Sequence, residues 1–185
     1  MSDDPGAIAL SLAKQMRSFD PGALAVLRRM GADGAAPAYW RLAASRPQLS
    51  QRPDRWAPIV RALAILTPKG APEQRGNLYE ATRPLGMALC DGGDPSWPNA
   101  PRPMLSERRL AQIMAARGVQ RDILLTRAIR ALAASKPVNA GLRVPDIAWV
   151  FLVPDRPETL AEPYYCRLDR AERAANETED TTADA

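Results

Sequence analysis

The sequence contains no histidine, only two cysteines and few aromatic residues. Without histidine, the chain cannot carry a Ser-His-Asp triad, a Cys-His dyad, a histidine-ligated metal or an imidazole acid or base. Cys90 and Cys166 cannot form a zinc cluster or a disulfide framework, and we expect both to be small buried side chains. These absences exclude many enzyme classes, so we expect no catalytic residue, no metal and no cofactor.

The sequence also lacks a long apolar run. The apolar stretch Ala7 to Ala13 is interrupted by Ser11 and followed by Lys14. No later stretch approaches the roughly 18 to 20 uncharged residues that a membrane-spanning helix needs. The chain begins with Asp3 and Asp4 in place of the positive charge that opens a signal peptide. We therefore expect a protein of the reducing cytoplasm with no membrane partner.

Lysine is scarce, because 22 of the 25 basic residues are arginine. Residues 169–185 carry a net charge of −4. Since the formal net charge of the whole chain is +4, residues 1–168 carry +8. A basic body favours a polyanionic partner, and arginine recognises phosphate with several donors in one plane. The alternative explanation is codon bias in a GC-rich genome, which the abundance of alanine also suggests.

Helical periodicity dominates, with proline and glycine at the boundaries. Asp20 is a candidate N-cap, with Pro21 in the first helical position. We predict a helix over 78–90 disturbed by Pro84, and another over 157–174. Residues 147–153 have the composition of a buried strand, but one short strand would have nothing to pair with, so we predict a helix. The sequence thus predicts an all-α fold, a compact bundle of about eight short helices in two packed groups.

A segment rich in proline and glycine divides the chain. We expect an N-terminal helical group over 1–90, a connection over 91–104, a C-terminal helical group over 105–168 and an acidic disordered tail over 169–185. Trp97 lies alone in the connection and is either an exposed anchor or folded back onto the core. The other three tryptophans lie on apolar helical faces, where we expect core packing: Trp40, Trp56 and Trp149.

Arginine at helical spacing is the remaining chemical signal. Arg127 and Arg130 share a helical face, and cations that open a helix, such as Arg108 and Arg109, are disfavoured by its dipole. Such residues would form a basic surface that contacts phosphates without reading sequence. The candidate nucleic-acid-binding residues are Arg28, Arg29, Arg108, Arg109, Arg117, Arg121, Arg127 and Arg130.

Four short motifs occur in a fixed order within residues 8–152: Leu27-Arg28-Arg29, Pro37-Ala38-Tyr39-Trp40-Arg41-Leu42, Leu85-Gly86-Met87-Ala88-Leu89, and Glu107-Arg108-Arg109-Leu110 with Gln112 and Ile113. In this order and spacing they resemble the CasB family, the small subunit of the type I-E CRISPR surveillance complex Cascade. Met87 stands where the family often has a basic residue, with Arg83 upstream.

The resemblance implies an all-helical, non-catalytic subunit that steadies the target and displaced (non-target) DNA strands of an R-loop. It also implies head-to-tail pairing with a second copy, and contact with the CRISPR RNA-containing backbone subunits and other Cascade subunits. The motifs assign nucleic-acid contacts to Arg28, Arg29, Arg108 and Arg109, and make Arg41 a candidate structural residue.

Two alternatives stay open. The first is a helical protein-interaction adaptor without direct nucleic-acid contact. The second is a metal-dependent nuclease built from turn aspartates, although capping is the ordinary role of acids beside proline and glycine. These aspartates are Asp91, Asp94, Asp146 and Asp155.

Overall fold

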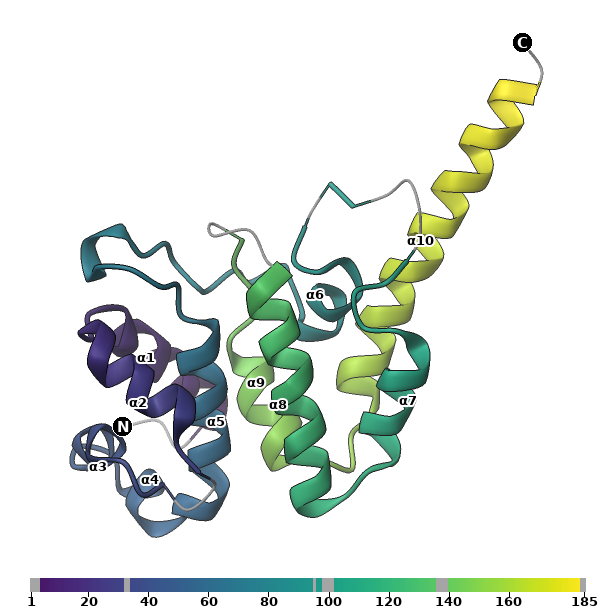
Figure 1. The fold of residues 1–185 in the computed structure, drawn as a ribbon. Coiled ribbons are helices and arrows are strands. Elements are labelled where there is room, and N and C mark those ends of the chain that lie inside the picture. Colours follow the sequence, from purple (N-terminus) through teal and green to yellow (C-terminus); the bar gives the residue numbers. More distant parts are fainter. Residues whose placement is uncertain (1–3, 32–33, 95, 98–101, 136–139, 184–185) are drawn as a thin grey trace.

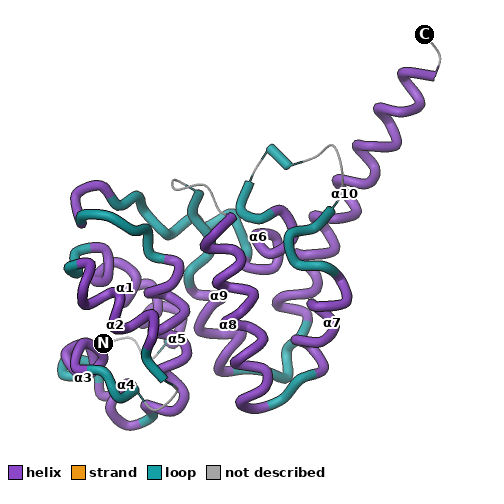
Figure 2. Tube along the Cα trace, in the orientation of Figure 1, coloured by secondary structure: helices purple, strands orange, loops and turns teal. Residues whose placement is uncertain are grey.

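A computed structural model describes residues 4–31, 34–94, 96–97, 102–135 and 140–183. These residues form α-helices with no β-strand, so the prediction of an all-α fold is confirmed (Figures 1 and 2). The described part has more helices than the eight expected. They are α1 (Pro5–Arg17), α2 (Pro21–Arg29), α3 (Pro37–Ala43), α4 (Pro47–Gln51), α5 (Pro53–Leu66), α6 (Leu85–Asp91), α7 (Glu107–Ala115), α8 (Gly118–Ser135), α9 (Pro145–Leu152) and α10 (Glu158–Ala183), with a 3-10 turn at Pro72–Gln74.

Proline opens many of these helices. It stands in the first turn of α1 to α5 and of α9, where a missing N–H costs no hydrogen bond. Asp4 accepts from the backbone N–H groups of α1, and Asp20 accepts from the N–H of Ala23 at 2.8 Å. The predicted start of the second helix at Asp20 and Pro21 is therefore confirmed. Residues 147–153 also follow the prediction, because α9 covers most of them.

Helix α5 lies at the centre of the packing. It contacts α1, α2, α4, α8 and α9, and its buried side chains include Ile59 and Leu63. The hydrophobic core is one cluster that takes residues from both sides of the 91–104 connection, such as Leu12 of α1 and Ile147 of α9. Among the described residues, no helix has both the length and the apolar character needed to span a membrane.

The predicted helix over 78–90 is wrong over its first half. The N–H of Leu142 donates to Leu78 O, and the N–H of Glu80 donates to Leu142 O, so this segment pairs with a distant one in an isolated β-bridge. Pro84 then forms the N-cap of α6. Since the residue before a proline is disfavoured in helical conformation, the helix begins only after Pro84. Helix α4 was not predicted, because five residues are too few to show a period.

The expected disordered tail from residue 169 is also corrected. Helix α10 runs to Ala183 and projects beyond the body of the protein (Figure 1). Ala171 is buried against the body, so the packed part of α10 extends past the predicted boundary. Residues 172–183 combine alanine and glutamate, which favour a helix, with asparagine, aspartate and three threonines, which do not, so helix propensity alone does not explain the continuation.

The packing of α6 on α10 requires a glycine. A Cβ atom added at Gly86 would overlap the backbone carbonyl oxygen of Leu160. Backbone cannot move aside as a flexible side chain can, so the two helices approach this closely only because Gly86 has no side chain.

We predict that Gly86→Ala lowers the free energy of unfolding by about 1 to 3 kcal/mol, because the added methyl group separates α6 from α10. Urea unfolding followed by circular dichroism measures this change. Gly22→Ala is the matched control, since a Cβ there meets only the side chain of Asp20. Equal midpoints for wild type and Gly86→Ala would contradict the close approach.

Candidate nucleic-acid interface

The eight candidate arginines do not share one environment. Arg121 is 2% exposed, and its Nη1 donates to the carbonyl of Val150 in α9. Burial lowers the pKa of Arg121. The expectation that Arg121 belongs to the exposed basic surface is therefore wrong: the side chain crosses the interior to cap a carbonyl of the neighbouring helix, which helical spacing alone does not reveal.

Arg28 is half-buried: its guanidinium donates to backbone carbonyls and also lines a groove. Its Nε donates to Ala64 O at 2.8 Å and its Nη2 donates to Thr67 O at 2.9 Å, at the carboxyl end of α5. Burial, followed by the charge of Arg75, lowers the pKa of Arg28. These bonds fix the guanidinium at the end of α5, where it also lines a groove against α8.

Arg117 is exposed, but its Nη1 donates to three carbonyl oxygens in the last turn of α7, at 2.8 to 3.2 Å. Arg29 and Arg108 are exposed, and neither side chain has a hydrogen bond or ion pair to another described residue. None of the eight candidates forms an ion pair with a carboxylate within the described part of the chain.

Helix α8 lies between α5 and α7 (Figure 1), and the two grooves beside it contain four of the candidates. Arg127 and Arg130 are exposed on α8 itself, one turn apart. On one side, the α5–α8 groove has a volume of about 650 Å³ and contains Arg28, Arg130 and Lys69. On the other side, the α7–α8 groove has a volume of about 320 Å³ and contains Arg109 and Arg127.

No aspartate or glutamate is among the residues that line these two grooves. The one acid in the sequence of α8, Asp122, is half-buried, and its burial raises its pKa against the opposing effect of Arg121, Arg61 and Arg55. Two grooves and the ridge between them therefore form a continuous cationic surface, which we call the α8 surface: Arg28, Lys69, Arg109, Arg127 and Arg130. The sequence did not single out Lys69, which lies three residues after the end of α5 and is one of only three lysines.

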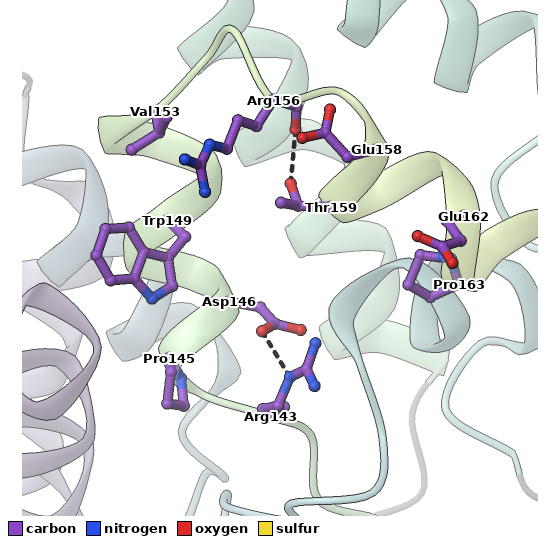
Figure 3. A pocket seen from close by; sticks show the side chains of 10 residues that line it. All are labelled: Arg143, Pro145, Asp146, Trp149, Val153, Arg156, Glu158, Thr159, Glu162 and Pro163. Carbon is purple, nitrogen blue, oxygen red and sulfur yellow. Dashed lines mark hydrogen bonds and ion pairs between the residues drawn. The ribbon is translucent and has the colours of Figure 1, made fainter.

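A second hollow, the α9–α10 cleft, has a different character (Figure 3). It has a volume of about 520 Å³ and presents the indole of Trp149, which is 37% exposed. Arg143 donates from Nε to Asp146 at 2.7 Å, so this pair is neutralised within the cleft wall. The remaining charged residues of the cleft have both signs: Arg156, Glu158 and Glu162. Phosphate groups would meet carboxylates here, unlike at the α8 surface.

Three of the four turn aspartates accept hydrogen bonds within the structure. Asp91 is buried and accepts from Arg83 Nη1 at 3.0 Å and from Arg167 Nε at 2.9 Å. Asp146 accepts from the N–H of Leu85 at the start of α6, and Asp94 accepts from Ser96. Asp155 is exposed. Within the described residues, no group of three or more cysteines and acids is placed to hold a metal ion.

The tryptophans and cysteines divide between core and surface. Trp56 is buried as predicted, whereas Trp40 and Trp149 are partly exposed, so core packing was wrong for these two. Trp97 folds back against the core and its ring stacks on the guanidinium of Arg167 at 5.3 Å. Cys90 is buried, which raises its pKa to about 12, but Cys166 is exposed, contrary to expectation.

Comparison of the chain with models of known protein families, with curated proteins and with solved structures finds no match. The arrangement of residues around α8 therefore carries the functional argument, together with the order of the sequence motifs.

We predict that Arg121→Ala lowers the free energy of unfolding by about 2 to 4 kcal/mol, because it removes a buried side chain and the donor to Val150. Arg108→Ala, at an exposed position whose side chain has no hydrogen bond to another described residue, is the control and should change stability far less. Thermal unfolding monitored by circular dichroism compares the two. Equal loss of stability in both variants would mean that Arg121 has no special structural role.

Proposed function

We propose that this chain is a non-catalytic nucleic-acid-binding subunit of a CRISPR RNA-guided surveillance complex, which holds the target and displaced DNA strands of the R-loop on the α8 surface. The observation that carries the proposal is a pair of grooves, one on each side of α8, each of which contains at least two cations and no carboxylate among its lining residues. Guanidinium groups left without acidic partners are suited to phosphate oxygens.

The motif arginines add a second line of support. Arg28 belongs to the first motif and Arg109 to the last, 81 positions apart in the sequence. They line the two grooves that flank α8, so segments that resemble the CasB family converge on one surface. Arg83, the basic residue upstream of Met87, instead forms a buried ion pair with Asp91 and does not contribute to this surface.

The character of the surface fits a partner that does not read sequence. Arginines that contact phosphates fix position, while base pairing with a guide RNA supplies specificity in such complexes. A body with a net charge of +8 predicts weak, salt-dependent binding by the isolated protein. Docking within a larger assembly would raise the effective concentration of the strands and hence the occupancy of the surface.

The first test replaces both exposed arginines of α8. We expect Arg127→Glu with Arg130→Glu to weaken binding to duplex and single-stranded DNA of any sequence, and to reduce the slope of log K against log salt by about 2, because two phosphate contacts are lost. Fluorescence anisotropy over a salt series measures both quantities. The matched control, Arg41→Glu with Arg170→Glu, makes the same change in net charge at exposed positions on α3 and α10. Equal weakening by both pairs would contradict a localised surface.

The second test compares the contributions of the two adjacent arginines of α7, Arg108 and Arg109, to DNA binding. Arg109 lines the α7–α8 groove, whereas Arg108 is exposed outside the residues that line it. We expect Arg109→Glu to weaken DNA binding several-fold more than Arg108→Glu, since only the former places a carboxylate beside Arg127. The same anisotropy titration at low salt ranks the two variants. A larger effect of Arg108→Glu would move the interface to another face of α7.

The α9–α10 cleft favours a second candidate function, the protein-interaction adaptor. An exposed indole between charges of both signs is typical of a protein-binding surface. This function predicts that complexes isolated with the chain survive nuclease treatment and are lost on Trp149→Ser. The proposed nucleic-acid function instead predicts that Arg127→Glu with Arg130→Glu removes the nucleic acid while Trp149→Ser leaves it bound.

A further inference from the structure

The exposed face of α8 changes character along its length. At 100° per residue, five side chains fall within an arc of about 80°, and all five are exposed. They are Val119, Ile123, Arg127, Arg130 and Ala134. The stripe is therefore apolar in the first two turns of the helix and cationic beyond them, and it contains no acid.

Folding does not account for the apolar end. Val119 is 69% exposed and Ile123 is 37% exposed, whereas Leu125 and Ile129 of the same helix are buried in the core. β-Branched residues are also weaker helix formers than alanine, arginine or glutamate, so these two do not stabilise an exposed turn. Val119 directly follows Gly118, whose positive φ of 54° marks the corner between α7 and α8. The apolar pair thus lies at an outer corner, beside the α8 surface.

We propose that Val119 and Ile123 contact unpaired bases of the strand whose phosphates lie on Arg127 and Arg130, so that the α8 surface prefers nucleic acid with unpaired bases over a continuous duplex. This inference rests on the proposed function and adds a selectivity to it. Apolar side chains that meet base faces act as wedges in other nucleic-acid complexes, but in an intact duplex those faces are covered by stacking.

The dimensions of the stripe suit this arrangement. Eleven residues separate Val119 from Arg130, which corresponds to about 16 Å along the helix axis. A strand that keeps the duplex spacing of about 3.4 Å per nucleotide would place roughly five nucleotides over this length, and a strand with unstacked bases would place fewer. The bases at one end meet the apolar corner, and the phosphates at the other end enter the two cationic grooves. A protein partner would need acidic and apolar groups at the same spacing, whereas every nucleotide carries a phosphate and an apolar ring face.

The experiment compares three synthetic DNA probes at fixed low salt: a continuous duplex, a forked duplex with unpaired arms, and a single strand with 2-aminopurine in its sequence. Anisotropy gives the affinity, and 2-aminopurine fluorescence reports whether bases change their stacking on binding. The variant is Val119→Ser with Ile123→Ser, in which both changes lie at exposed positions. The control is Val26→Ser, since Val26 is 39% exposed on α2 and lies two positions from Arg28, so it points away from the α5–α8 groove.

We expect wild type to bind the fork and the single strand more tightly than the duplex, and the double serine variant to lose roughly threefold to tenfold in affinity for those two probes only. The 2-aminopurine signal should fall with the affinity, while duplex binding and the helical circular dichroism stay unchanged. Val26→Ser should match wild type throughout.

Two results overturn the inference. If the double serine variant binds all three probes as wild type does, the apolar corner has no part in nucleic-acid contact. If the double serine variant loses the same factor in affinity for all three probes, Val119 and Ile123 do not distinguish unpaired bases from paired ones. Both results leave the proposed function intact, because that function fails only if wild type binds none of the probes or if Arg127→Glu with Arg130→Glu has no local effect.

Discussion

A guanidinium taken out of water must find hydrogen-bond acceptors, and this requirement organises the molecule. Arg75 is the clearest case: it is almost fully buried and donates to the carbonyl oxygens of Arg17 and Phe19 at the end of α1 and of Gly70 in the loop after α5. Arg28 does the same at the end of α5, and Arg121 donates to α9. Interior arginines thus join helices by donating to backbone carbonyls. The arginines of α7 and α8 that make no such hydrogen bond to a neighbouring helix in the interior remain at the surface.

The same packing positions the surface charges. Because α8 is held between α5 and α7, its exposed ridge is flanked by two grooves, and each groove receives a cation from the neighbouring segment. Arg28 is immobilised by two carbonyls, so one part of the α8 surface is fixed before any ligand arrives. Arg127 has no described partner, and Arg130 makes only a long contact of 3.5 Å with Arg28 O, so both are available for new bonds. The α8 surface therefore combines a fixed guanidinium, that of Arg28, with two side chains that are available for new bonds, Arg127 and Arg130. This combination suits an irregular, flexible polyanion.

Local signals in the sequence predicted most helices, because proline in the first turn and aspartate caps act within a few residues of where they stand. The errors come from contacts between distant segments. Residues 78–80 are not helical because they pair with Leu142, and Arg121 is buried with its guanidinium donating to Val150 of α9. Helical spacing predicted Arg127 and Arg130 on one exposed face, but it gave no means of knowing that Arg28 and Arg109 would flank them. The resemblance to the CasB family stays a prediction, which is supported by the position of Arg28 and Arg109, from two of its four motifs, in the grooves beside α8.

The lack of histidine and of carboxylates around α8 has a consequence for acid conditions. Guanidinium groups keep their proton at every pH at which proteins stay folded, so titration does not erode the charge of this surface. Asp122, the single acid on the helix, has a raised pKa because it is half-buried. Acidification therefore neutralises a negative neighbour and removes no positive one, and the electrostatic potential over the two grooves grows stronger as the medium becomes more acidic.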